Sequence, residues 1–121
     1  MEIFLEEEKR APVLVLYSLF LAGIVGPIVE EIFFRGFFYP ILKQKWGIAW
    51  AMVITSSAFA FIHQNQFAFW PIFLLGMALA YLYEKRRNII APITLHVVHN
   101  SLFLAYFFLA KQIILNSGST P

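Results

Sequence analysis

Two adjacent glutamates, Glu30 and Glu31, lie in an apolar stretch of the chain that also contains Arg35. These three are the only charged residues between Arg10 and Lys43. An ionised side chain at the centre of a lipid bilayer costs about 3 kcal/mol on insertion scales. Carboxylates in such a place are expected to face a protein interior or a wet cavity, where they form ion pairs or move protons.

The two glutamates differ in the partner that the sequence offers them. Glu31 and Arg35 are four residues apart, so they share a helical face and are predicted to form an ion pair. Glu30 points about 100° away around the helix and has no such partner. We therefore expect Glu31 to be structural and Glu30 to act as a general base. In the alternative interpretation, the charges only tie helices together.

All three histidines of the chain also fall in apolar segments. His96 and Asn100 are four residues apart and share a face, as do Phe59 and His63. We interpret the third histidine, His99, as a bystander.

Together these groups predict hydrolysis. A water held between Glu30 and a histidine would lose a proton and attack a carbonyl, and His96 and Asn100 would receive the oxyanion. Neither Ser56 nor Ser57 has an adjacent base in sequence, so a serine nucleophile is not favoured.

A metal site is the alternative reading of the same residues. A zinc ion could be held by Glu30, His63 and His96 with one position open. The chain has no HExxH motif, however, and its glutamates precede its histidines at a different spacing. We therefore expect no metal cofactor.

The composition is that of an integral membrane protein. The 121 residues are 60% hydrophobic and only 13% charged, whereas a soluble domain is about 25% charged. No basic tract with interleaved aromatics indicates nucleic-acid binding. The absence of cysteine excludes disulfides and a thiol nucleophile. The acidic start, MEIFLEEEKR, is unlike a signal peptide, so we expect it to be retained.

Four apolar segments are long enough to be membrane-spanning helices. They cover residues 11–42, 48–64, 67–83 and 89–115. The predicted fold is an all-α integral membrane bundle of about four transmembrane helices. The first segment is long for one crossing, and Gly23, Gly26 and Pro27 predict a bend in it.

The short connections predict the orientation and part of the packing. Basic residues at 43–45 and 85–87 place these two loops on one side, which the positive-inside rule makes cytoplasmic. This topology puts Glu30 inward of mid-span and His63 near the opposite end, so a shift of one helix is required for them to meet. Gly76 and Ala80 are interpreted as a packing notch.

Three short motifs resemble those of one family. EEIFFR (30–35), FAFIH (59–63) and HVVHN (96–100) are similar to the EExxxR, FxxxH and HxxxN/D motifs of the CPBP family. This family is also called the ABI or CAAX prenyl protease 2 family and includes the Ras-converting endoprotease. The resemblance covers about residues 20–110.

The resemblance implies a glutamate-type intramembrane endopeptidase and a role for each motif residue. Glu30 and His63 would activate the water, and His96 and Asn100 would form the oxyanion site. The supporting residues would be Glu31 and Arg35, which position the catalytic helix, and Phe59, which packs beside the site.

The same resemblance predicts the domain organisation and the partners. Members of the family carry about eight spans, so we expect residues 1–121 to be a single core domain of a minimal or truncated member. The partners would be the lipid bilayer, a peptide or protein substrate that is prenylated or a peptide precursor, and a second copy of the chain. Two alternatives stay open: a non-catalytic bacteriocin self-immunity or scaffold protein of this fold, and a small transporter with a proton relay.

Overall fold

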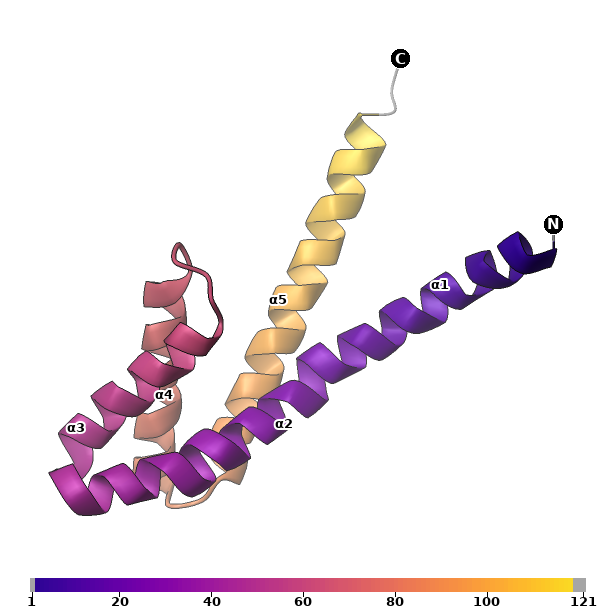
Figure 1. Ribbon diagram of the computed structural model, residues 1–121. Helices are drawn as coiled ribbons and strands as arrows, with labels where there is room; N and C mark the ends of the chain where they lie inside the picture. Colours follow the sequence, from indigo (N-terminus) through magenta and orange to yellow (C-terminus); the bar gives the residue numbers. More distant parts are fainter. Residues whose placement is uncertain (1, 119–121) are drawn as a thin grey trace. The chain divides into compact units, whose positions relative to one another are not determined.

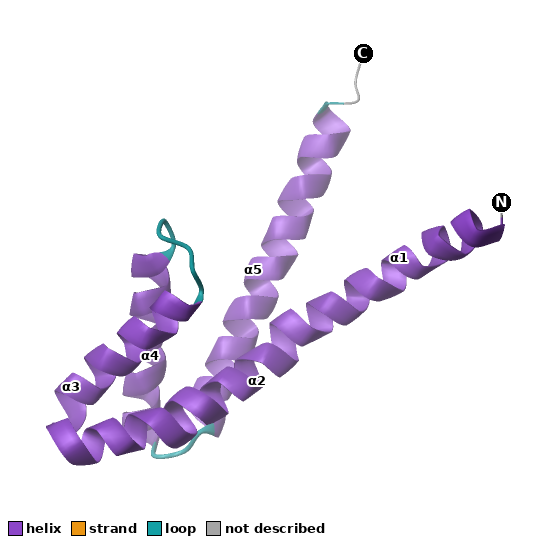
Figure 2. Ribbon diagram, viewed as in Figure 1, coloured by secondary structure: helices purple, strands orange, loops and turns teal. Residues whose placement is uncertain are grey.

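The computed structural model describes residues 2–118, with side chains from Ala11 to Gly118. Nearly all of this part is helical, and no strand occurs within it (Figure 1, Figure 2). The elements are α1 (Glu2–Phe20), a π-helical segment (Leu21–Val25), α2 (Gly26–Glu31), a second π-helical segment (Ile32–Phe38), α3 (Tyr39–Ile62), α4 (Phe69–Arg86) and α5 (Ile90–Ser117). The predicted all-α class is confirmed.

The expected bend near Pro27 takes the form of a π-helical segment. Here the N–H of Gly26 donates to the carbonyl of Leu21, five residues back, and the helix continues without a break. Pro27 comes next and has no N–H to continue that register. The extra residue in the turn therefore accommodates the proline without ending the helix.

A second π-helical segment follows the glutamates and ends in the same way. The N–H of Tyr39 donates to the carbonyl of Phe34, and Pro40 comes next. Glu30 and Glu31 thus lie on a short α-helical stretch with a π-helical segment on each side. π-Helical turns are rare and occur frequently at functional sites.

Gly47 separates two arms of α3. Its φ of 82° and ψ of 175° form a backbone conformation that side chains disfavour, which suits glycine. The connection predicted from Lys43 to Gly47 is therefore reduced to one non-helical residue. The second arm then runs antiparallel to α4 in a hairpin, which is visible at one side of Figure 1.

Asparagine side chains begin the last two helices. Oδ1 of Asn65 accepts the N–H groups of Phe67 and Ala68 ahead of α4, and Oδ1 of Asn88 accepts that of Ala91 in the first turn of α5. The segment predicted to end at residue 83 instead continues to Arg86, because Glu84, Lys85 and Arg86 are good helix formers.

Two stretches of the described chain are long and apolar enough to cross a membrane. They are Ala11–Ile62, which contains an 18-residue window with a mean hydropathy of 2.2, and Ile90–Ser117, which contains one with a mean hydropathy of 1.5. The first stretch contains two of the four predicted spans, which are separated at Gly47. Helix α4 is apolar for most of its length but ends in three charged residues.

The chain divides into two compact units. The first comprises Met1–Pro27 with Val97–Pro121, and the second comprises Ile28–His96. In the first unit, Gly23 lies close to α5, since a Cβ there would be 3.4 Å from Oγ of Ser101. The expectation that residues 1–121 form one domain stays a prediction.

The second unit has a small core. It lies between α4 on one side and the π-helical segment Ile32–Phe38 with the two arms of α3 on the other. Its buried apolar side chains are Phe34, Tyr39, Leu42, Ala51, Phe59, Leu79 and Ala80. Gly76 permits the close approach of α4 to α3, because a Cβ there would lie 3.1 Å from both Cα and Cβ of Ser56. This geometry confirms the predicted packing notch at Gly76, and Ala80 is buried in the same core.

Candidate active site

A buried ion pair forms the base of the candidate site, within the unit Ile28–His96. Nη1 of Arg35 lies 3.0 Å from Oε1 of Glu31, and both side chains are fully buried. Nη2 of Arg35 donates to the carbonyl of Gly76 at 2.8 Å. The guanidinium carbon is 4.9 Å from the ring centroid of Phe59, a cation–π distance. The pair predicted from the four-residue spacing is thus confirmed.

Gly76 contributes twice to this arrangement. Its missing side chain lets α4 approach α3, and its carbonyl accepts the second arm of the guanidinium. The sequence reasoning identified the notch and missed the hydrogen bond. A backbone carbonyl cannot be recognised as an acceptor from the pattern of side chains. The one available signal was Arg35 itself, because a buried guanidinium has more donors than a single carboxylate can accept.

His96 is held by the same carboxylate oxygen. Its Nδ1 lies 2.8 Å from Oε1 of Glu31, and only 1% of its side-chain surface is exposed. A carboxylate that is paired with Arg35 accepts hydrogen bonds, so Nδ1 carries the proton. The other ring nitrogen, Nε2, then faces Glu30, whose Oε2 is 3.7 Å away.

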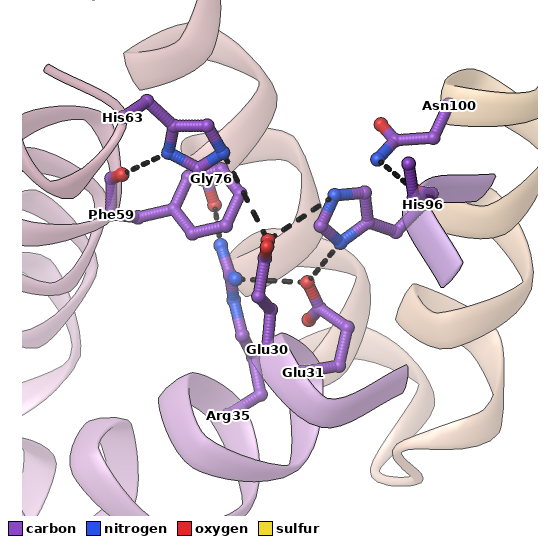
Figure 3. A network of polar contacts seen from close by, with 9 residues as sticks. Glu30, Glu31, Arg35, Phe59, His63, Gly76, His96 and Asn100 are labelled. Atoms are coloured by element: carbon purple, nitrogen blue, oxygen red, sulfur yellow. Dashed lines mark hydrogen bonds and ion pairs between the residues drawn. The ribbon is translucent and has the colours of Figure 1, made fainter. Parts of the chain in front are cut away.

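Glu30 lies between two histidines. Its Oε2 is 3.7 Å from Nε2 of His96 and 4.0 Å from Nε2 of His63 (Figure 3). The Oε2 atom is buried and has no hydrogen-bond partner among the described residues, although 30% of the side chain is exposed. The glutamate thus offers an unsatisfied, buried acceptor beside two imidazole nitrogens, while the rest of its side chain is partly exposed.

His63 is oriented by its own helix. Its Nδ1 lies 2.7 Å from the carbonyl of Phe59, an acceptor, so Nδ1 carries the proton and Nε2 presents a lone pair toward Glu30. About a third of His63 is exposed. The ring of Phe59 lies between the two histidines, with centroids 4.9 Å from His63 and 5.5 Å from His96.

Six of the seven residues singled out from the sequence therefore converge within one unit. They are Glu30, Glu31, Arg35, Phe59, His63 and His96, and Figure 3 shows their side chains pointing toward one another. The separation between Glu30 and His63 that the topology implied is absent. The seventh residue, Asn100, belongs to the other unit, where its amide donates to the carbonyl of Ala22 at 3.2 Å.

Comparison with known proteins identifies the family. Residues 12–102 match the model of the family described as type II CAAX prenyl endopeptidase Rce1-like. The chain belongs to this Rce1-like family. The resemblance inferred from the three motifs is therefore confirmed, and with it the assignment to a family of membrane peptidases.

Three curated relatives resemble part of this Rce1-like chain. "Putative membrane peptidase YdiL" of Bacillus subtilis is 29% identical over 100 residues, which are 83% of this chain and 39% of the relative. "Membrane-embedded CAAX protease MroQ" of Staphylococcus aureus is 31% identical over 103 residues, 78% of this chain and 40% of the relative. "UPF0177 protein YxdF" of Lactococcus lactis is 29% identical over 92 residues, 74% of this chain and 48% of the relative.

The chain thus spans 39–48% of the length of the curated relatives that it matches. No solved structure matches it.

The remaining polar residues of this Rce1-like chain take other roles. Oγ of Ser57 donates to the carbonyl of Val53, and Oγ of Ser56 is buried without a hydrogen-bond partner among the described residues. Within residues 11–118, neither hydroxyl is hydrogen-bonded to a basic side chain. His99 is exposed, and its interpretation as a bystander stays a prediction.

The histidine and carboxylate atoms of the described residues form no group of three or more that could hold a metal ion. The atoms that come nearest to such a group are Oε2 of Glu30 and Nε2 of His63 and His96, which face one another at 3.7–4.0 Å from the carboxylate.

A second polar cluster, which the sequence analysis did not anticipate, lies at the far end of the hairpin from the turn at residues 63–68. Nζ of Lys43 lies 2.7 Å from Oε1 of Glu84, and the hydroxyl of Tyr39 donates to Oε2 at 2.8 Å. The hydrogen bond from Lys43 holds the pKa of Glu84 below its usual value. This ion pair joins the two basic segments at one end of the unit, as predicted, whereas their cytoplasmic location stays a prediction.

Proposed function

We propose that this chain is a membrane endopeptidase in which Glu30 and His63 activate the hydrolytic water. The observation that carries the proposal is the position of Oε2 of Glu30, 4.0 Å from Nε2 of His63. This separation is too long for a direct hydrogen bond and suits a water that bonds to both atoms at about 2.8 Å. Both atoms can accept, so the water would donate both hydrogens and direct a lone pair outward to a carbonyl carbon.

The reaction then follows general-base hydrolysis. Glu30 takes a proton from the water as its oxygen bonds to the carbonyl carbon, and the carbonyl oxygen becomes an oxyanion. Glu30 then passes the proton to the amide nitrogen, the C–N bond breaks, and an acid and an amine leave. The partial exposure of Glu30 and His63 supports access for a peptide.

His96 is proposed as an oxyanion donor, with its charge balanced by Glu31. This role requires a proton on Nε2 of His96 as well as on Nδ1, and Oε1 of Glu31 lies 2.8 Å from Nδ1. The imidazolium would then donate through Nδ1 to Glu31 and through Nε2 to the developing oxyanion. The proposal of Asn100 as the second donor rests on its spacing of four residues from His96 along α5.

The substrate class is proposed from the relatives. One of them is named a CAAX protease and another a membrane peptidase, so we propose a peptide or protein substrate at the bilayer, either prenylated or a peptide precursor. Exposed apolar side chains along α1 and α5 support a lipid environment for the reaction.

Glu30→Gln tests the function, with Glu84→Gln as the matched control. Both changes replace a carboxylate by an amide, but only Glu30 faces the histidines. In proteoliposomes supplied with quenched fluorescent peptides, with and without a farnesylated CAAX end, Glu30→Gln should lower kcat by about 10²- to 10⁴-fold. Glu84→Gln should retain activity. Full activity in Glu30→Gln would exclude Glu30 as the base. Absence of cleavage by the wild type would favour a non-catalytic immunity or scaffold role.

The zinc alternative is separated by its metal dependence. We propose a metal-free reaction, in which dialysis against a chelator leaves activity unchanged and purified protein contains less than a stoichiometric amount of zinc. A site built on Glu30, His63 and His96 predicts instead that activity is lost on chelation and restored by zinc.

A further inference from the structure

The orientation of the Asn100 side chain is fixed by one hydrogen bond within the unit formed by Met1–Pro27 and Val97–Pro121. Its Nδ2 donates to the carbonyl of Ala22 at 3.2 Å (Figure 3). A carbonyl oxygen can only accept, so the nitrogen of the amide must face Ala22 and Oδ1 must face elsewhere. One N–H of the amide is thereby engaged, and the second stays available.

The carbonyl of Ala22 is available because of Pro27. In this π-helical turn Gly26 donates to Leu21, five residues back, so residue 27 is the next donor in the register and Ala22 the next acceptor. Pro27 has no N–H, and the Ala22 carbonyl is left without that partner. In a membrane helix such a freed carbonyl is costly unless a neighbouring side chain satisfies it.

The backbone around Gly23 allows that side chain to reach it. Gly23 is buried, and an added Cβ would lie 3.4 Å from Oγ of Ser101 and 3.5 Å from a methyl of Leu104. The residue after the freed carbonyl and the residue after Asn100 therefore lie in close contact. This approach of the two backbones explains why an amide as short as that of asparagine spans the gap.

We propose that Pro27 is a positioning residue for Asn100. By withholding the N–H that would otherwise bond to Ala22, it creates the acceptor that orients the amide and leaves the second N–H for the oxyanion. This inference rests on the proposed function for its catalytic consequence. The hydrogen bond itself, and its dependence on Pro27, do not require that function.

The test is Pro27→Ala, which supplies the missing N–H, with Pro12→Ala as the control. Pro12 also lies inside a helix, α1, which directly precedes the π-helical segment Leu21–Val25, and it is exposed. In Pro27→Ala the new N–H competes for the Ala22 carbonyl, and kcat should fall about 10- to 100-fold with KM unchanged. Pro12→Ala should match the wild type.

A double-mutant cycle isolates the coupling. Asn100→Ala should lower kcat by about 100-fold, and Pro27→Ala/Asn100→Ala should equal Asn100→Ala alone, because the orienting bond has no role once the amide is gone. A wild-type kcat in Pro27→Ala would overturn the proposal. So would a double mutant whose loss equals the product of the two single losses.

A second readout needs no activity. The side-chain amide resonances of Asn100 in ¹⁵N-asparagine-labelled protein, assigned by their disappearance in Asn100→Asp, should shift in Pro27→Ala and not in Pro12→Ala. Unmoved resonances in Pro27→Ala would overturn the inference. If the wild type cleaves no peptide while these resonances shift, the peptidase proposal fails and the coupling of Pro27 to Asn100 stands.

Discussion

Nδ1 of His96 lies 2.8 Å from Oε1 of Glu31, the same oxygen that accepts Nη1 of Arg35. The carboxylate thereby fixes which nitrogen of His96 carries a proton and turns the other toward Glu30. Two adjacent glutamates thus act on one imidazole from opposite edges. This arrangement gives a physical reason for the pair: Glu31 orients the histidine, and Glu30 is left without a partner of its own.

The first prediction compares the two glutamates by the same substitution. Glu31→Gln should destabilise the protein by about 3 kcal/mol, because it leaves Arg35 buried without its counter-charge. Glu30→Gln should change stability by less than about 1 kcal/mol, since Oε2 of Glu30 makes no direct hydrogen bond to the described residues. Denaturant unfolding in detergent micelles, followed by tryptophan fluorescence, measures both. Equal losses in the two variants would contradict the division of roles.

Much of this site was predictable because its signals are local. The Glu31–Arg35 pair follows from helical spacing, and the breaks at Gly47 and at residues 63–68 follow from glycine and asparagine in short polar segments. The motif resemblance added the order of the histidines. Charged side chains in an apolar segment are energetically unfavourable unless they are paired. Few arrangements pair them, so the ion pair of Glu31 and Arg35 could be predicted with few alternatives.

The parts that were missed depend on the backbone or on the register between helices. Nothing in the side-chain pattern indicated that the carbonyl of Gly76 would accept from Arg35, or that Glu31 would bond to His96 as well as to Arg35. The π-helical segments were missed for a similar reason. A proline predicts a disturbance of the helix, but whether it kinks, ends or widens depends on which carbonyls find other donors.

The second prediction compares His63 and His99, the two histidines with exposed side chains. His63→Ala should lower kcat by about 10²- to 10⁴-fold, because it removes one of the two acceptors proposed to hold the water. His99→Ala, a change of the same kind at an exposed position, should leave kcat and KM unchanged. Steady-state cleavage in proteoliposomes gives both constants. A loss in His99→Ala as large as that in His63→Ala would contradict the assignment.

The third prediction tests the approach of α4 to α3. In Gly76→Ala the new Cβ would lie 3.1 Å from Cα and Cβ of Ser56, so one helix must move, at a cost of about 1–3 kcal/mol. The shift also moves the carbonyl that accepts from Arg35. In the control, Gly36→Ala, the nearest atom is Cδ1 of Ile89 at 3.3 Å, the end of a flexible side chain. That variant should be neutral or slightly stabilised, since alanine favours a helix over glycine.

The same pair of variants distinguishes packing from catalysis. If Gly76→Ala unfolds at the same denaturant concentration as the wild type, the close contact between Gly76 and Ser56 does not determine the stability of the hairpin. If it is less stable but also has a lower kcat at temperatures where it is fully folded, displacement of Arg35 has reached the site. Gly36→Ala serves as the reference in both measurements.

The last prediction is a pH dependence at the ion pair of Lys43 and Glu84. The hydrogen bond from Lys43 is the main cause that lowers the pKa of Glu84 in the folded protein. A carboxyl with a depressed folded pKa binds fewer protons when folded than when unfolded. Its contribution to stability is therefore present above the unfolded pKa of about 4.5 and is lost as the pH falls through the lower folded value.

Lys43→Gln removes that contribution. Because 41% of the Lys43 side chain is exposed, the difference from the wild type should be small, about 0.2–1 kcal/mol at pH 7. It should decline to zero below the folded pKa, where Glu84 is protonated in both proteins. Lys45→Gln, which removes a charge of the same sign two residues along the chain, controls for net charge. Unfolding midpoints of the three proteins between pH 3 and pH 7 measure the effect. A stability difference between the wild type and Lys43→Gln that grows as the pH falls would reverse the predicted sign and exclude this pair as its source.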